Sequence, residues 1–378
     1  MDLGFEKSGV NITAAYDNDE AAVTSYNRNL KHSAIQREIS DATTLPSNLD
    51  IICATPPCQG FSTAGGYKTE DPRNNLLITS CRLIVNSQPK VAVIENVAAL
   101  TNKRNIPILQ HCIELLKSAG YHVKLQILNC EDYGVPQRRK RAFIFARSGG
   151  REFNTDMLIE NSSKSKLHDV LMGLEGLTNA HTPKFLEEGS KHFLIAQAIK
   201  PGQKLCNVRA GQTAVPTWMI PEVFGHTTRS ERQFLSAVRS LRRRNRKRSY
   251  GDADPISLAE INTELSSDAG NLVSILTKKG YLRRVGNLFD LTNTFNGKYR
   301  RLNMYENSPT VDTRFGDFQL FLHPTQHRGM TVREAARIQG FPDSFLFSEK
   351  PNTSFRLIGN AVPPPVAAKV ANFAKSLV

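Results

Sequence analysis

The sequence lacks the cysteine spacings that accompany a zinc site or a disulfide framework. Its six cysteines, at positions 53, 58, 81, 112, 130 and 206, are widely spaced and include no Cys-x-x-Cys pair. Scattered single cysteines are typical of a reducing compartment, so we expect a cytoplasmic protein. The sequence also has no apolar run near the roughly 18 residues of a membrane span, and its N-terminus does not resemble a signal peptide. We therefore expect no association with a membrane.

Acidic residues are outnumbered by basic ones. There are 49 Lys and Arg against 35 Asp and Glu, which gives a net charge of +14 and a pI near 9.6. This balance favours a polyanionic partner over an acidic small molecule, although many soluble proteins share it. With 378 residues and 40% hydrophobic content, the chain can form two domains, or one large domain with an insertion.

The first 150 residues have the alternation of a doubly wound α/β domain with a mostly parallel sheet. Apolar runs of strand length alternate with segments of helical spacing. Expected strands are residues 11–16, 50–55, 91–95, 121–129 and 142–146, and expected helices are 19–30, 75–86 and 105–119. In such sheets ligands bind beyond the carboxyl ends of the strands, where polar clusters begin at Asp17, Pro56 and Glu95.

A different pattern begins after residue 150. Residues 151–322 show no regular alternation and include a run, 239–248, with seven basic residues in ten. Within them, the sequence 256–291 suggests helices and a short hairpin, as in a winged helix. An ordered pattern returns in residues 323–378, where Thr331 and Glu334 predict the capping box of a helix through Gln339.

The strongest chemical indication is the segment Pro56-Pro57-Cys58-Gln59-Gly60-Phe61-Ser62, directly after the predicted strand 50–55. Two prolines stiffen the turn and a glycine lets the backbone pass closely, so a thiol is fixed at a strand end. A fixed, partly exposed cysteine suits nucleophilic catalysis. The alternative is a small apolar cysteine in a loop, which describes Cys53, Cys81 and Cys112 well.

The next predicted strand ends in Glu95, which places a carboxyl group at the same sheet edge as the thiol. A buried carboxylic acid with a raised pKa can protonate or hydrogen-bond a ring nitrogen and so prepare the ring for attack by a thiol. Its alternative role is a helix N-terminal charge. Further on, Arg139 and Arg141 would share one face of an extended segment. Such a basic run is more often a solvated edge or a phosphate contact.

The order of these motifs resembles the cytosine-C5 DNA methyltransferase family outside residues 151–322. The matching segments are the Pro-Pro-Cys-Gln loop at Cys58, the residues Asp71, Arg73 and Leu76, the triplet Glu95-Asn96-Val97, the residues Gln137, Arg139 and Arg141, and the segments 333–342 and 359–363. The resemblance implies that Cys58 adds to C6 of a flipped-out cytosine, that Glu95 holds N3 and the exocyclic amine, and that Arg141 binds O2, with Arg139 beside it in the catalytic group. Flipping exposes both faces of the ring.

The resemblance also implies S-adenosylmethionine as the methyl donor. Asp17 matches the acidic residue for the ribose hydroxyls, although the family has glutamate there, and Asp41 matches the acidic residue for the adenine amine. The remaining contacts fall to Pro57, Leu76, Asn360 and Val362. Asp41 could instead be a helix cap, and Leu76 simply a core residue.

One family motif is not found. The family begins with a strand and a Phe-x-Gly-x-Gly-Gly loop, whereas this chain opens inside the segment that follows, at Leu3-Gly4-Phe5. We expect either a start codon set too late or a remnant. Without that central strand, the chain from Met1 is expected to bind the cofactor poorly, to aggregate, and to methylate DNA weakly or not at all. The alternative functions are therefore a non-catalytic DNA-binding remnant and an RNA cytosine-C5 methyltransferase.

Residues 151–322 lie where the family keeps its target-recognition domain. They hold 25 basic and 18 acidic residues, half the positive excess of the chain. Arg242, Arg243 and Arg244 are expected to contact phosphates of double-stranded DNA, and Gln59 and Ser62 to contact DNA beside the nucleophile. The alternative for the basic run is a solvated loop. The resemblance suggests a monomer in a restriction-modification system, coupled to its nuclease in function but not physically.

Overall fold

The chain forms two compact units. The computed structural model describes residues 1–57, 75–150, 152–160, 164–246, 254–265 and 269–378. Unit 1 comprises residues 1–181, 305–313 and 332–378, and unit 2 comprises residues 182–304 and 314–331. These boundaries differ from the predicted ones, since 151–181 and 305–313 belong to unit 1, which holds the sheet, and 323–331 belong to unit 2. The chain therefore passes between the units four times.

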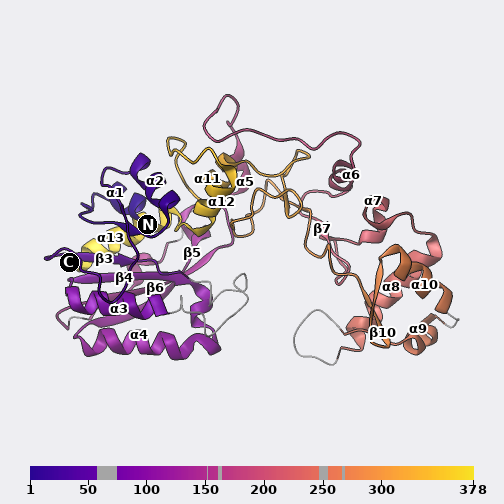
Figure 1. Ribbon diagram of the computed structural model, residues 1–378, viewed down its shortest axis with the longest axis horizontal. Coiled ribbons are helices and arrows are strands. Elements are labelled where there is room, and N and C mark those ends of the chain that lie inside the picture. Colours follow the sequence, from indigo (N-terminus) through magenta and orange to yellow (C-terminus); the bar gives the residue numbers. More distant parts are fainter. Residues whose placement is uncertain (58–74, 151, 161–163, 247–253, 266–268) are drawn as a thin grey trace. The chain divides into compact units, whose positions relative to one another are not determined.

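The main sheet of unit 1 has four strands in the order β3-β4-β6-β5 (Figure 1). β3 (Ile51–Ala54) and β4 (Val91–Val97) are parallel, while β6 (Lys140–Arg147) runs antiparallel to both β4 and β5 (His122–Asn129). Three of these strands share one direction, as expected for the predicted α/β class, whereas β6 is reversed and makes two of the three pairings antiparallel. In the register, Ala54, the last residue of β3, pairs with Ile94, so Glu95 of β4 lies one residue beyond the end of β3.

Helices cover both faces of this sheet (Figure 1). On one face, α3 (Asn75–Ser87) and α4 (Ile106–Ser118) pack on Ala92, Ile94 and Ile144. On the other face, α1 (Asp2–Lys7) and α13 (Pro364–Leu377) pack on Val91, Val93 and Phe145. Alternate residues of one strand therefore supply two separate cores, because side chains alternate across a strand. Among the described helices, none is long and apolar enough to cross a membrane.

A second, two-stranded ladder lies near the N-terminus. β1 (Tyr16–Asp17) pairs in parallel with β2 (Ile35–Gln36) and is followed by α2 (Glu20–Asn29). The predicted strand 11–16 is thus much shorter, since among the described residues only its last position joins a ladder. α1 packs closely on α13 at Gly4. A Cβ atom at this position would lie only 2.5 Å from Ala367 Cβ, so the close approach requires glycine.

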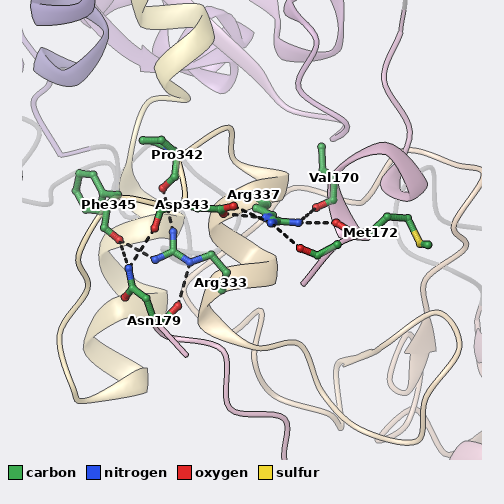
Figure 2. A network of polar contacts seen from close by, with 9 residues as sticks. Val170, Met172, Asn179, Arg333, Arg337, Pro342, Asp343 and Phe345 are labelled. Atoms are coloured by element: carbon green, nitrogen blue, oxygen red, sulfur yellow. Dashed lines mark hydrogen bonds and ion pairs between the residues drawn. The ribbon is translucent and has the colours of Figure 1, made fainter. Parts of the chain in front are cut away.

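The C-terminal helices of unit 1 hold the segment that leads to unit 2. α11 (Val332–Ile338) occupies the region predicted as a helix after Thr331, and α12 (Pro351–Asn360) follows it, while α5 (Leu167–Leu171) lies against α11. The Arg333 side chain donates to the carbonyl oxygens of Asn179 and Phe345, and that of Arg337 donates to Met172 (Figure 2). Two arginines of one helix thereby fix residues 170–181 from several sides.

One part of unit 2 consists of short elements around a small core. The elements are α6 (Lys191–Gln197), β7 (Lys204–Leu205), β8 (Ala214–Val215), α7 (Pro221–Phe224), β11 (Arg300–Arg301) and β12 (Phe321–Leu322). β11 pairs in parallel with β12, which joins the two chain segments of the unit. Buried Arg301 reinforces this join, since its guanidinium donates to the carbonyl oxygens of Ile199, Ala196 and His323.

The other part of unit 2 has the element order of a winged helix. α8 (Arg229–Arg244), α9 (Leu258–Leu265) and α10 (Gly270–Lys279) precede a hairpin of β9 (Leu282–Val285) and β10 (Leu288–Leu291). Ile256 exchanges two backbone hydrogen bonds with Phe289 of β10 and so adds a third extended segment. The helices and hairpin share one core that includes Phe234, Leu276 and Tyr281. We call residues 227–292 the winged-helix region.

Candidate active site

Glu95 and Arg141 form the centre of the candidate site. Arg141 Nε lies 2.9 Å from Glu95 Oε1, and the two side chains are only 10% and 13% exposed. The pairing follows from the register of β4 and β6, in which Glu95 lies opposite Phe143 and Arg141 opposite Val97. The two residues are therefore diagonal neighbours on antiparallel strands, within reach of long side chains.

The environment of Glu95 opposes its ionisation. Burial raises the pKa of its carboxyl group above the ordinary glutamate value, while the positive charges of Arg141 and Arg139 partly offset that rise. A carboxylic acid whose pKa is raised keeps its proton to a higher pH than an exposed glutamate. It can then donate that proton, or a hydrogen bond, to a ring nitrogen.

A hydrogen bond ties the end of β3 to β4 beside this pair. The Asn96 side chain is buried, and its amide donates to the carbonyl oxygen of Pro56 at 3.2 Å. Pro56, two residues after the end of β3, is thus held by Asn96, the residue that follows Glu95. Pro57 is exposed. Cys58 itself, with Gln59, Ser62, Asp71 and Arg73, lies outside the described residues.

Arg139 has a different position from the one predicted. Its side chain is 1% exposed and donates to the carbonyl oxygens of Val311, Gly359 and Ala361 at 2.8 to 3.0 Å. These contacts hold the end of α12 against the sheet, where Gly359 comes so near residues 312 and 313 that a Cβ would lie 2.6 Å from their backbone. Arg139 is therefore a positioning residue, which corrects the catalytic role predicted for it.

Two of the residues predicted to bind the cofactor lie in or near α12: Asn360 is part of this helix, and Asp17 is close in sequence to a residue that pairs with it. Asp17 is exposed at the end of β1, and Asp19, two residues later, forms an ion pair with Arg356 of α12. Asn360, the last residue of that helix, is exposed, whereas Val362 is buried. The pair Asp19 and Arg356, which the sequence analysis did not identify, thus connects the cap of α2, just after β1, to the middle of α12.

Asp41 and Leu76 lie along α3. Arg82 Nη1 is 2.6 Å from the Asp41 carboxylate. A hydrogen bond from Thr79 and this contact with Arg82 both lower the pKa of Asp41. Leu76 is half-buried and lies one helical turn before Thr79. A cavity of about 280 Å³ opens beside Asp41 and Arg82. Its other lining residues are Val85 and Asn86, toward the end of α3, and Leu115 of α4, so it lies away from the carboxyl ends of the strands.

The three arginines predicted to contact DNA phosphates differ in their surroundings. Arg242 is 3% exposed and pairs with buried Asp290, so the prediction for Arg242 is wrong. Arg244 is exposed but pairs with Glu264 of α9, and Arg243 is exposed. The last turn of α8 thus contributes partly to the fold of the winged-helix region. Lys247 and Arg248 lie outside the described residues.

Comparison with known proteins gives matches along nearly the whole chain. The family profile described as "C-5 cytosine-specific DNA methylase" matches residues 1–376. The Type II methyltransferase M.HgiCII of Herpetosiphon aurantiacus is 31% identical, over 96% of this chain and 91% of the relative. The Type II methyltransferase M.DdeI of Desulfomicrobium norvegicum is 29% identical, over 97% of this chain and 84% of the relative.

Solved structures agree at the level of the fold. The Dnmt2 methyltransferase of S. pombe superimposes with a TM-score of 0.58 at 15% identity, and the match covers 100% of this chain and 95% of that one. The methyltransferase EhMeth of Entamoeba histolytica gives a TM-score of 0.52 at 16% identity, with 99% and 94% covered. At such identities the likeness concerns the fold alone.

Proposed function

Because the chain belongs to the C-5 cytosine-specific DNA methylase family, we propose that Cys58, Glu95 and Arg141 carry its catalysis. The activity itself is that of a DNA (cytosine-5-)-methyltransferase. The observation that supports this assignment most is the buried carboxyl group of Glu95, with its raised pKa and its neighbour Arg141. It stands at the sheet edge from which the chain runs to Cys58.

In the proposed mechanism the Cys58 thiolate forms a bond to C6 of a flipped-out cytosine, while Glu95 gives a proton or a hydrogen bond to N3. The Arg141 guanidinium hydrogen-bonds O2 and stabilises the charge that develops on the ring. S-adenosylmethionine, when bound, supplies an electrophilic methyl group for C5. A base, for which a water molecule suffices, then removes the C5 proton, and the C6–S bond breaks to release Cys58 as a thiolate. The proton on N3 returns to Glu95, which restores the aromatic ring.

We assign the cofactor contacts to Asp17, Asp41, Pro57, Leu76, Asn360 and Val362. The donor set suits this ligand, since carboxylates accept hydrogen bonds from ribose hydroxyls and an adenine amine, and Leu76 and Val362 offer apolar walls. The exposed position of Asp17 at a strand end supports its role. An adenine amine at Asp41 would compete with Arg82, which pairs with that carboxylate.

Unit 2 is proposed to be the target-recognition domain for double-stranded DNA. It interrupts the sequence of unit 1, and exposed Arg243 can contact phosphates without specifying sequence. Gln59 and Ser62 are proposed to contact DNA beside the flipped base. The names of the Type II relatives suggest a restriction-modification system, in which methylation by a cytoplasmic monomer protects one short site from a separate nuclease.

The test is to incubate the protein with S-adenosylmethionine and genomic DNA and to map methylated bases at single-base resolution. In contrast to the weak methylation expected from the sequence alone, the family match over residues 1–376 leads us to expect 5-methylcytosine at one position of a short recurring sequence. Methylation at cytosine N4 or adenine N6, or methyl transfer to RNA but not to DNA, would contradict the proposal.

A further inference from the structure

The helix α10 has an exposed face that is separate from its core face. Val273 and Leu276 are buried in the core of the winged-helix region. Four exposed residues follow the spacing i, i+3, i+4 and i+7, which brings them into one row on the helix surface. We call this row the α10 stripe: Asn271, Ser274, Ile275 and Lys278.

The α10 stripe has the chemistry of base recognition. An asparagine amide can donate to and accept from adenine, a lysine can donate to guanine, and a serine hydroxyl can bond either partner. Ile275 is 37% exposed although it is apolar, and such a side chain can contact the methyl group of thymine. By contrast, the next residue, Lys279, donates to Glu231 and to the carbonyl oxygen of His226.

The position of α10 in the fold suits entry into the major groove. It is the third helix of the winged-helix region and directly precedes the hairpin, and the second helix of a helix-turn-helix pair is the one that contacts base edges. Arg284 of the hairpin is exposed. The sequence 227–292 contains 13 Lys and Arg against seven Asp and Glu, so its field attracts DNA.

The basic run at the end of α8 is a weaker candidate for the same task. Arg239 lies over the Trp218 ring at 5.4 Å, Arg242 pairs with Asp290, and Arg244 pairs with Glu264. These contacts pack α8 against Trp218, α9 and the hairpin. Three of the seven basic side chains of the run are therefore committed to the fold, whereas all four side chains of the α10 stripe are exposed.

We propose that the α10 stripe lies in the major groove of double-stranded DNA and selects bases of the methylated sequence, with the β9–β10 hairpin on the adjacent backbone. This inference rests on the proposed function, because it assigns the choice of site to one helix of the target-recognition unit. Asn271, Ser274 and Lys278 are then specificity-determining residues, and Arg284 supplies a contact that is independent of sequence.

The test is selection of DNA duplexes from a randomised pool by the purified full chain, followed by sequencing. Asn271→Ala, Ser274→Ala and Lys278→Ala are compared with the wild type, singly and combined. We expect discrimination at one or two base pairs to fall by about tenfold or more for each lost contact. Arg284→Ala should weaken binding to all duplexes alike and lower the salt dependence of binding.

The matched control is Lys191→Ala, which removes one charge from the exposed first residue of α6 in the same unit. It should select the wild-type sequence, and thermal unfolding should show that all variants are folded. If the combined α10 variant selects the wild-type sequence, or if the wild type selects none, the inference is overturned.

Mapping of methylated bases with the same proteins separates the two proposals. A wild type that selects a sequence changed by the α10 substitutions but transfers no methyl group supports the inference and contradicts the catalytic proposal. If the wild type methylates one site and the combined variant methylates the same site equally well, the catalytic proposal is supported and the inference about α10 is contradicted.

Discussion

At the residue scale, the protonation state of Glu95 decides what its carboxyl group can do. Burial raises the pKa of this group above the glutamate value, whereas Arg141 and Arg139 lower it. Because burial has the larger effect, the protonated form persists to a higher pH than in an exposed glutamate. The proton offered to N3 is lost as the pH rises through the raised pKa.

We predict that Glu95→Gln slows turnover by about 100-fold or more, since an amide can donate a hydrogen bond to N3 but cannot transfer a proton. In the wild type, kcat should have an alkaline limb that reflects loss of the Glu95 proton, and this limb should be absent in the variant. The measurement is kcat against pH at saturating DNA. A near-normal rate for Glu95→Gln would make Glu95 a structural residue.

Cys58 is predicted to form the covalent bond to cytosine. Cys58→Ala should abolish methyl transfer but retain DNA binding, because the thiol is needed for attack on C6 and not for contact with the duplex. The matched control is Cys53→Ala on β3, five residues earlier, where burial raises the pKa of the thiol and makes it a poor nucleophile. Retained turnover in Cys58→Ala, measured with labelled methyl donor, would contradict the assignment.

At the element scale, α12 depends on Arg139 for its position against the sheet. Arg139→Met should destabilise the protein by about 3 kcal/mol or more, because two buried carbonyl oxygens and one part-buried carbonyl oxygen lose a charged donor together. It should also raise KM for S-adenosylmethionine, since the segment it holds contains Asn360.

Thermal unfolding and cofactor titration measure these two effects. The control is Arg138→Met, whose exposed side chain lies 3.6 Å from that of exposed Glu306 and should matter little. Equal stability of Arg139→Met and wild type would contradict the positioning role.

The last turn of α8 gives a second prediction at this scale. Arg242→Ala should lower the unfolding temperature, because Asp290 stays buried and loses one of its two arginine partners. Arg243→Ala should leave the unfolding temperature unchanged and weaken DNA binding in a salt-dependent manner. Unfolding scans and binding titrations at two salt concentrations separate the two variants, and identical behaviour would contradict the distinction.

At the scale of the whole molecule, the layers of unit 1 were predictable from the sequence, because strand-length apolar runs and helical spacing are local patterns. Partners distant in sequence were not. Arg139 was expected beside the substrate, yet the carbonyl oxygens it holds lie 172 and 220 residues further along the chain. Arg242 was expected to be a surface charge, but it is buried in an ion pair with Asp290, which is distant in sequence. The strand predicted at 11–16 was shorter for the same reason, since pairing depends on partners elsewhere in the chain.

The two-segment construction of unit 2 leads to a prediction about exchange of this unit between relatives. Replacing residues 182–304 alone with the matching part of a relative should destabilise the protein. The β11 strand and Arg301 would then come from the relative, whereas their partners, β12 and the His323 carbonyl oxygen, would not. Replacing 182–304 and 314–331 together should restore folding and transfer the donor's DNA site. Unfolding scans and methylation maps of both chimeras check this, and a stable single-segment chimera would contradict it.

The same construction bears on how such a protein can diversify. Residues 305–313 lie between the two segments of unit 2 in sequence but belong to unit 1, where Val311 accepts from Arg139 and Ser308 exchanges backbone hydrogen bonds with 136–138. A single recombination tract that carries a new site preference must therefore also carry this short stretch. We expect homologous exchange to succeed mainly between lineages whose versions of 305–313 are interchangeable, so that nine residues outside unit 2 limit which new site specificities the lineage can acquire.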